Sequence, residues 1–341
     1  IRDVERSRGL GDVYKRQIQG SLCLGTSLNK LGYDHVFYVK LASGSVFSCL
    51  VNNGDTNAIR RTVNNILLDG PSLRAYRHFP NVGKRKSWAA ADASKRGIEL
   101  AIISNYEDEI YESVQNENKW GFESSFLANS KIEFGKDLNN WVIQNILFKV
   151  LFPAEFHGQS AVEAAIELSE EFNKNINKFE KVNIYTHEPA MRIISNKEVL
   201  KNASDRDHSM EYMVAAALLY GELKYEMYEE SFEGFENINN LRKKIFVSEQ
   251  PQFTKDYYEF SKRYISNSIE IVYNDNSISE KITIENPIGH PSRRDEAVPL
   301  LKEKFLRNVI SIFDTEKASE VWDKIINLKN CLLYTSDAAD E

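Results

Sequence analysis

Apolar residues recur at helical spacing through most of the chain. The pattern is clearest in three stretches of the first half, HVFYVKLASGSVFSCLV (35–51), NAIRRTVNNILL (57–68) and KSWAAADASKRGIELAII (86–103). Small residues are concentrated between Ala89 and Ala93, which lets neighbouring helices approach closely. We therefore expect a tightly packed helical domain in this part of the chain.

Three later stretches are rich in β-branched and aromatic residues and predict strands. They are KVNIYT (181–186), NSIEIVYND (267–275) and ISEKITIE (278–285). An Asn-Asp-Asn sequence separates the last two, which predicts a hairpin. A small sheet is therefore expected in the second half of the chain.

Helical stretches surround these strands. SAVEAAIELSEEF (160–172) begins with Ser160 and Glu163 at the spacing of a capping box, and SMEYMVAAALLY (209–220) is almost entirely apolar. Two further helices are expected near the end of the chain, at 300–313 and 318–328. The order of elements predicts a mainly α protein, in which a large all-helical domain is joined to a smaller α+β domain.

Both ends of the chain resemble translated sequencing-library adapters. The tail reads CLLYTSDAADE (331–341), and the head contains SRGLGDVYKRQ (7–17). We therefore expect 1–17 and 331–341 to be foreign to the natural protein, and the sequence between them to be truncated at both ends.

Composition and charge argue against several classes of protein. Of 341 residues 42% are hydrophobic and 27% charged, as in a folded soluble protein. The longest apolar run, 213–220, is far shorter than the roughly 20 residues that cross a bilayer. A net charge of −7 argues against nucleic acid as a partner. The chain has three cysteines, Cys23, Cys49 and Cys331, which are too few for an iron–sulfur cluster and suit a reducing compartment such as the cytoplasm.

The segment RAYRHFPNVGKRKSW (74–88) is strongly basic in an acidic protein. Its basic residues are Arg74, Arg77, His78, Lys84, Arg85 and Lys86, and it contains no acidic residue. A turn at 81–83 leads into a helix that starts near Lys86, so free backbone N–H groups and basic side chains could converge on a multiply charged carboxylate. Crowding by Lys84 and Arg85 would lower the pKa of Lys86, as proton transfer by an amine requires. The alternative is a solvated basic face paired with acidic neighbours.

Other stretches carry candidate acids and bases. FPAEFHGQ (152–159) places Glu155 and His157 before a helix, and Asp34-His35 precedes another. A capping or packing role is the alternative at each of them.

Two further stretches combine histidine with arginine. His208 stands one helical turn before Tyr212, which predicts that both side chains lie on one helix face. The residues just before His208 include Asp205, Arg206 and Asp207, and a turn near the end of the chain carries His290, Arg293 and Arg294. Helix capping with local salt bridges, or a hinge, explains these stretches equally well.

Several catalytic motifs are absent from the sequence. It has no Gly-rich phosphate loop, H-E-x-x-H, G-x-S-x-G or Cys-x-x-Cys. The residues by themselves therefore indicate only an anion-binding protein of two domains.

Longer strings in the same stretches resemble the MmgE/PrpD family. The strings are LGYDHVFYVKLAS (31–43), DGPSLRAYRHFPNVGKRKSWAAADAS (69–94), NILFKVLFPAEFHGQSAVEAA (145–165), ASDRDHSMEYMVA (203–215) and NPIGHPSRR (286–294). DGPSLRAYRH and FPAEFHGQ are distinctive of its methylcitrate branch. The resemblance implies iron–sulfur-independent 2-methylcitrate dehydratase activity without a cofactor or metal, a tricarboxylate substrate, and a homodimer with its active site between the two domains.

The resemblance also implies a domain layout. The helical domain would span 18–155 with part of it missing at the N-terminus, an α+β lid domain would span 156–288, and the C-terminal helices at 289–330 would return to the helical domain. A eukaryotic member would be mitochondrial and a bacterial one cytoplasmic. Segments upstream of residue 18, one of which carries active-site Asp and His residues, would be missing.

Site residues follow from the same matches. The implied catalytic residues are Lys86, His35, His157, His208 and Tyr212. The implied substrate-binding residues are Arg74, Arg77, Arg85, Asp205, Arg206 and Arg293. Glu155 and His157 are alternatives for the position where decarboxylase and epimerase relatives carry a histidine.

The implied reaction removes water from a tertiary alcohol flanked by carboxylates, in propionate catabolism and with citrate as a second possible substrate. Cations such as Lys86 would meet the developing negative charge, and His35, His157 or His208 would protonate the departing hydroxide. Two alternatives stay open: another family reaction such as cis-aconitate decarboxylation or epimerisation, and a non-catalytic anion-binding helical protein.

Overall fold

The computed structural model describes residues 2–138, 141–195, 197–310 and 312–327. The chain forms two compact units, Ile1–Ile146 and Leu147–Asn327, which are described separately. The predicted foreign tail, with Cys331, lies outside the described residues. The predicted foreign head forms the first part of helix α1 (Arg2–Gly25), and its origin stays a prediction.

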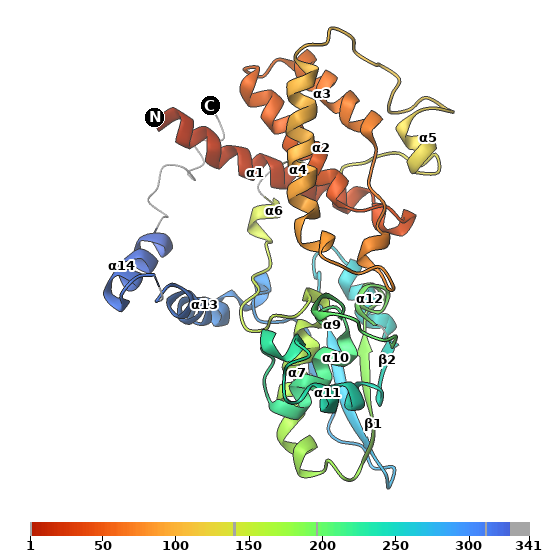
Figure 1. Ribbon diagram of the computed structural model, residues 1–341, viewed down its shortest axis with the longest axis vertical. Helices are drawn as coiled ribbons and strands as arrows, with labels where there is room; N and C mark the ends of the chain where they lie inside the picture. Colours follow the sequence, from red (N-terminus) through yellow and green to blue (C-terminus); the bar gives the residue numbers. More distant parts are fainter. Residues whose placement is uncertain (1, 139–140, 196, 311, 328–341) are drawn as a thin grey trace. The chain divides into compact units, whose positions relative to one another are not determined.

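The regular elements of the first unit are all helices in its described part, and loops join them. After α1 come α2 (Val36–Val51), α3 (Thr56–Asp69), α4 (Arg85–Ser104), α5 (Phe122–Phe126) and α6 (Trp141–Gln144), with 3₁₀ turns η1 (Leu28–Leu31) and η2 (Ala75–Arg77). Figure 1 shows α2, α3 and α4 packed side by side. The helices predicted at 35–51, 57–68 and 86–103 are confirmed to within two residues at each end.

Helix α2 is the central element of this unit. All of its residues from Val36 to Gly44 are buried, and the Phe37 ring stacks on Phe122 with 5.0 Å between centroids. Helix α4 lies so close to it that a Cβ on Gly97 would collide with the carbonyl oxygen of Lys40. Glycine on α4 therefore lets the two helices meet, and this contact places the start of each helix in the candidate site.

The second unit combines helices with a small sheet. Its helices are α7 (Gln159–Lys174), α8 (Glu188–Ile194), α9 (Ala203–Arg206), α10 (Met210–Tyr220), α11 (Phe235–Arg242), α12 (Pro251–Tyr258), α13 (Arg294–Val309) and α14 (Thr315–Ile326). Its 3₁₀ turns are η3 (Phe156–Gly158), η4 (Tyr225–Tyr228) and η5 (Pro291–Arg293). The strands are β1 (Phe179–Thr186), β2 (Ile245–Glu249), β3 (Asn267–Tyr273) and β4 (Ile282–Ile284). A mainly α fold with a small α+β unit is therefore confirmed.

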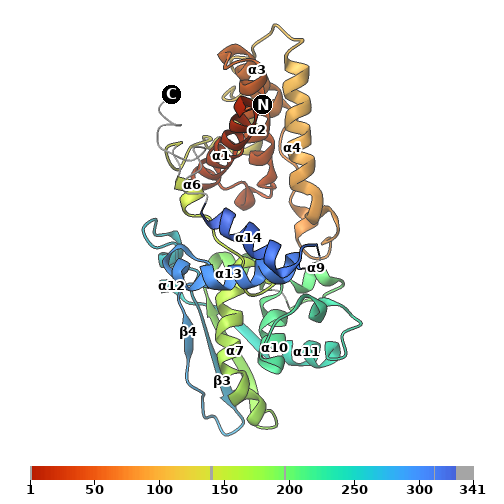
Figure 2. The ribbon, with the colours of Figure 1, turned by 90° about the vertical axis from the view of Figure 1, so that its left-hand side faces the viewer.

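The four strands form one mixed sheet in the order β2-β1-β3-β4. β1 pairs in parallel with β2 and antiparallel with β3, so that Val182 is opposite both Ile245 and Ile271. The predicted hairpin is confirmed, because β3 and β4 pair antiparallel. Helix α7 packs against β3 and β4, as Figure 2 shows, and α10 packs on α7 with all residues from Met210 to Leu218 buried.

Three details correct the expectations. Ser160 and Glu163 do not form a capping box: α7 begins after Gly158, Ser160 donates to the Ile265 carbonyl, and Glu163 pairs with Arg293. His208 and Tyr212 do not share a helix face, because α10 begins only at Met210 and Ser209 caps it. The helices α13 and α14 are grouped in the second unit, and the predicted domain boundaries stay predictions.

Candidate active site

The loops before α2 and after α3 are joined by backbone hydrogen bonds. Asp34 N donates to Ser72 O at 2.9 Å, and Arg74 N donates to Gly32 O at 3.1 Å. These bonds hold the basic segment that follows Arg74 beside Asp34. Two stretches that stand apart in the sequence are thus parts of one cluster.

Asp34 is the centre of that cluster. Its side chain is fully buried and accepts hydrogen bonds from Arg77 Nε at 2.6 Å, from the Tyr76 hydroxyl and from Val36 N at 3.2 Å. Burial raises the pKa of Asp34, but the hydrogen bonds from Tyr76 and Arg77 outweigh it and hold the pKa below its ordinary value. Asp34 therefore remains ionised and fixes the orientation of Arg77.

His35 lies next to two arginines. Its Nδ1 atom is 3.2 Å from Arg74 Nη1 and 3.1 Å from Asp34 Oδ1. Burial, together with the charges of Arg77 and Arg74, lowers the pKa of His35 to about 4 against the opposing charge of Asp34. The ring is therefore neutral near pH 7, which suits hydrogen bonding or proton acceptance and makes it a poor proton donor.

Arg74 itself is almost completely buried. Its Nη1 atom donates to Asn29 Oδ1 at 3.1 Å and its Nε donates to His78 Nε2 at 3.1 Å. A guanidinium held in this way keeps a fixed position beside the His35 ring.

Arg85 and Lys86 begin helix α4. The Arg85 guanidinium lies 5.3 Å from the Tyr76 ring centroid and 4.4 Å from that of Trp88, while the Lys86 side chain is partly exposed. The backbone N–H groups here are not free as expected, because Lys86 N donates to Gly83 O at 3.1 Å and Ser87 N to Lys84 O at 3.0 Å. The site therefore offers basic side chains rather than an amide nest for an anion.

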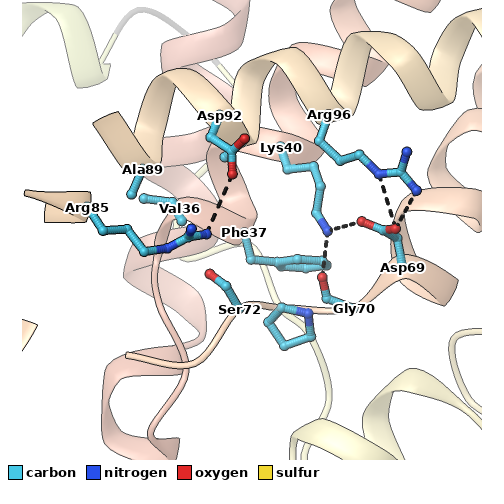
Figure 3. A pocket seen from close by; sticks show the side chains of 12 residues that line it. Val36, Phe37, Lys40, Asp69, Gly70, Ser72, Arg85, Ala89, Asp92 and Arg96 are labelled. Carbon is cyan, nitrogen blue, oxygen red and sulfur yellow. Dashed lines mark hydrogen bonds and ion pairs between the residues drawn. The ribbon is translucent and has the colours of Figure 1, made fainter. Parts of the chain in front are cut away.

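A cavity of about 200 Å³ lies on the α3–α4 side of α2. Figure 3 shows Lys40 reaching between Asp69 and the Gly70 carbonyl, with Nζ distances of 2.7 and 2.6 Å, while Arg96 donates to the same carboxylate at 2.7 Å. Burial lowers the pKa of Lys40 in spite of Asp69. These charges satisfy one another and connect three helices, so this cluster stabilises the first unit.

Two predicted stretches also meet in the second unit. Glu155 N donates to Asp207 O at 3.3 Å, which places the turn η3 beside the turn that follows α9. His157 on η3 and His208 are close enough for the charge of His208 to lower the pKa of His157, although burial is the larger cause. His208 is partly exposed, and its Nδ1 atom is 2.6 Å from Asp207 Oδ1.

His157 is paired with a histidine that the sequence analysis did not single out. His157 Nδ1 is 2.9 Å from Nε2 of the fully buried His187, and the Tyr257 ring stacks on His187 with 4.8 Å between centroids. Burial lowers the pKa of His187 to about 3 and raises that of Tyr257 to about 12. The signal available in the sequence was a histidine directly after the predicted strand at 181–186.

Asp205 and Arg206 form the last part of the short helix α9. Asp205 Oδ2 accepts from Lys201 N at 2.9 Å, so it holds the local backbone. Arg206 is 2% exposed and pairs with Glu230 at 3.1 Å, but its Nε and Nη1 atoms have no partner among the described residues. Buried unpaired donors of this kind are rare in proteins and indicate a site for an acceptor.

Tyr212 and Arg293 are engaged by the protein. Tyr212 is fully buried, its hydroxyl donates to Met227 O at 2.5 Å, and burial raises its pKa to about 12. Arg293 is held by Glu163 at 2.7 Å and by Glu296 at 2.7 Å. Both side chains therefore position secondary structure in the second unit.

No three His, Cys, Asp or Glu side chains within the described ranges are grouped so that they could hold a metal ion. The described helices also include none with the length and apolar character of a membrane span.

Family models match both parts of the chain. Residues 16–135 match the MmgE/PrpD N-terminal domain and residues 152–329 match the MmgE/PrpD C-terminal domain. The expectation from the sequence strings is thus confirmed for the family.

Curated relatives cover most of the chain. It is 40% identical over 316 residues to "2-methylcitrate dehydratase" of Salmonella typhimurium and 40% identical over 308 residues to that of Escherichia coli K12. It is 37% identical over 314 residues to "2-methylcitrate dehydratase, mitochondrial" of Yarrowia lipolytica. The matches cover 89–92% of this chain and 60–65% of the relatives, so the chain spans less than two thirds of their length. With matching models in both halves and these relatives, the chain belongs to the MmgE/PrpD family.

Proposed function

We propose that the protein is a hydro-lyase that removes water from 2-methylcitrate to give 2-methyl-aconitate in propionate catabolism, with citrate as a possible second substrate. The observation that carries this proposal is the 37–40% identity to 2-methylcitrate dehydratases over about nine tenths of the chain. The geometry of the two units supports it by offering the groups that the reaction needs.

The reaction breaks a C–H bond next to a carboxylate and a C–O bond, and it forms a C=C bond. A base takes the proton, and the hydroxide leaves with a proton from an acid, so the products are the alkene and water. Negative charge that develops on the carboxylate next to the C–H bond must be met by fixed positive groups. The groups that we propose for these steps are two imidazoles and several cations.

His157 is proposed as the base, since its lowered pKa keeps the ring neutral and ready to accept a proton near pH 7. His208 is proposed as the acid, because its Nδ1 atom lies 2.6 Å from the Asp207 carboxylate, which orients the ring. His35, which the sequence analysis also considered as the acid, is assigned hydrogen bonding to the substrate instead.

Basic side chains are proposed to bind the substrate carboxylates, as the family resemblance implies. In the first unit these are Arg74, Arg77, Arg85 and Lys86, of which Arg77 is oriented by Asp34. In the second unit Arg206 supplies two buried donors that lack a protein partner among the described residues. Asp205, Tyr212 and Arg293 are assigned to positioning, since their polar atoms already have partners.

We also propose a homodimer that uses no metal or cofactor and resides in the cytoplasm, or in mitochondria if the source is eukaryotic. These statements rest on the family resemblance. Light scattering of the purified protein during gel filtration measures the oligomeric state directly.

The test is an assay of the full-length reading frame that contains this sequence. The protein is purified with a chelator, and formation of unsaturated tricarboxylate and of carbon dioxide is followed from 2-methylcitrate and from cis-aconitate. We expect alkene formation from 2-methylcitrate without carbon dioxide. Carbon dioxide from cis-aconitate would establish a decarboxylase, epimerised acid an epimerase, and binding without turnover a non-catalytic protein.

The variant Lys86→Ala tests the proposed role of Lys86 in the same assay. Loss of a cation that meets developing charge should lower kcat by about 10²- to 10³-fold. Lys95→Ala is the matched control, because Lys95 lies on the same helix, is 75% exposed and forms an ion pair with Glu99 at 3.3 Å. Equal turnover of the two variants would remove Lys86 from the proposed mechanism.

A further inference from the structure

His187 occupies a position that its local structure does not explain. It follows β1 and is the N-cap residue of α8, yet its side chain makes no capping hydrogen bond. Ser, Thr, Asp and Asn are the residues that cap helices well, and a histidine here leaves the helix end without that support. A fully buried polar ring at such a position indicates that another contact determines the residue.

That contact is with His157. The two rings are joined through His157 Nδ1 and His187 Nε2 at 2.9 Å. On its other side, His187 Nδ1 lies 3.4 Å from the carbonyl oxygen of Ser266. The three groups therefore form a chain that runs from a backbone carbonyl through His187 to His157.

We infer that His187 is a positioning residue that fixes the neutral His157 ring in the Nδ1–H tautomer and leaves the lone pair on His157 Nε2. The inference rests on the proposed function only in taking His157 as the base. His187 Nδ1 lies 3.4 Å from both the Ser266 carbonyl oxygen and the Thr186 hydroxyl. A carbonyl oxygen can only accept, whereas a hydroxyl can donate or accept, so a proton on Nδ1 is the arrangement that satisfies both contacts. Nε2 of neutral His187 must then accept, and His157 Nδ1 must donate to it.

The tautomer determines which nitrogen of His157 can accept a proton. With its proton on Nδ1, the neutral ring can take up a further proton only at Nε2, an atom with no hydrogen-bond partner among the described residues. When His157 becomes protonated, its Nδ1–H bond to His187 strengthens, because a charged donor makes a stronger hydrogen bond. His187 thus orients the base and stabilises its protonated form.

The surroundings hold this arrangement. Asn267 Nδ2 donates to His157 O at 2.9 Å, and Glu155 accepts from His157 N at 2.7 Å, so the backbone of η3 is fixed. Tyr257 covers the His187 ring, with 12° between the ring planes. The remaining charges that face His157 are those of Glu155, Glu188, Arg192 and His208.

A matched pair of variants separates positioning from packing. In His187→Gln the amide oxygen is the same number of bonds from Cα as His Nε2, so it can still accept from His157. In His187→Asn the amide reaches only as far as Nδ1, so the contact with Ser266 can remain while that with His157 is lost. Both variants delete the ring that stacks on Tyr257.

The first readout is the tautomer of His157, measured from nitrogen chemical shifts and couplings in histidine-labelled full-length protein. The chain has six histidines, and a His157→Gln sample assigns the signal. We expect Nδ1–H in the natural protein and in His187→Gln, and a shift towards Nε2–H in His187→Asn. An Nε2–H ring in the natural protein would overturn the inference whether or not either variant folds.

The second readout is kinetic. His187→Asn should lower kcat by about 10- to 100-fold, as loss of a partner that orients an imidazole does elsewhere, with little change in KM. The acid limb of the pH profile of kcat/KM should move to lower pH, because protonated His157 has lost its acceptor. His187→Gln should retain most of kcat, and equal kinetics in the two variants would contradict the inference.

The two readouts also distinguish this inference from the proposed function. If the protein has no dehydratase activity but His157 shows the expected tautomers, the proposed function fails and the positioning by His187 stands. If activity is present and His187→Asn changes neither tautomer nor kcat, the proposed function stands and the positioning fails.

Discussion

The two units each contain a histidine with a lowered pKa, but they surround it with different groups. In the first unit the His35 side chain is 40% exposed, and it lies among ions, with Arg74, Arg77 and Asp34 around it. In the second unit His187 is 0% exposed, and its contacts include a second imidazole, a tyrosine ring, a backbone carbonyl and the Thr186 hydroxyl. Burial is the largest cause of the lowered pKa in both, but the charges of Asp34, Arg77 and Arg74 also act on His35, whereas only His157 acts in this way on His187.

The largest effect should come from breaking the charge balance at Asp34. Asp34→Asn keeps the volume of the side chain but leaves the Arg77 guanidinium without its carboxylate in a buried site. Loss of one partner of a buried pair costs about 3 to 5 kcal/mol. We expect a loss of this size in the free energy of unfolding of the first unit, measured by hydrogen exchange of its amides.

Asp92→Asn is the control for that measurement. Asp92 also pairs with an arginine, Arg85, but at 3.5 Å and with about half of its side chain exposed. A surface pair of this kind contributes little to stability. If both substitutions have the same small effect, the central place of Asp34 in the cluster is refuted.

Acid should lower the free energy of unfolding of the second unit, because His187 is buried there in its neutral form. Its pKa falls from 6.5 to about 3 on burial, so between these pH values the unfolded chain binds a proton that the folded chain does not. The free energy of unfolding is therefore unaffected by this group above about pH 6.5, and it decreases as the pH falls towards 3, by about 1.4 kcal/mol for each step of one in pH. Urea unfolding at a series of pH values measures this loss.

His187→Gln should flatten that pH dependence, since the amide does not titrate. His208→Gln serves as the control, because it removes a histidine whose side chain is 29% exposed and leaves the buried His187 in place. An unchanged acid slope in His187→Gln would show that other groups are responsible for it.

The sequence predicts more of the surroundings of His35 than of the surroundings of His187. The basic segment and Asp34-His35 could be found because an excess of one charge is visible in a linear sequence. Their meeting could not, because it depends on the hydrogen bonds that join the loops at Asp34 and Arg74. His187 was missed altogether, since its partner His157 is 30 residues away and only the folded strand β1 brings the rings together.

The fold shows the same limit. Runs and periodic patterns of apolar residues located the long helices and the β3–β4 hairpin, because these residues are the ones that local sequence shows directly. The parallel partner β2 and the short helix α9 were not predicted, as β2 has five residues and α9 only four. The capping box at Ser160 was predicted wrongly, because a tertiary hydrogen bond to Ile265 takes the Ser160 hydroxyl.

The smallest changes in stability are expected from replacing either of the two cations that share the carboxylate of Asp69. Lys40 is about 9% exposed and also donates to the Gly70 carbonyl, whereas Arg96 is 43% exposed (Figure 3). Lys40→Met should lower the free energy of unfolding by about 1 to 3 kcal/mol, since it leaves a buried carbonyl unpaired. Arg96→Met should cost less than about 1 kcal/mol, because its pair is near the surface.

The double variant decides whether burial or charge determines these values. Each single substitution leaves Asp69 with one cation, and only the double variant leaves the carboxylate without any. Its loss of stability, measured by urea unfolding, should therefore exceed the sum of the single losses. A larger loss for Arg96→Met than for Lys40→Met, or strict additivity, would mean that the first unit uses Asp69 as a surface charge and that its ion pairs do not depend on burial.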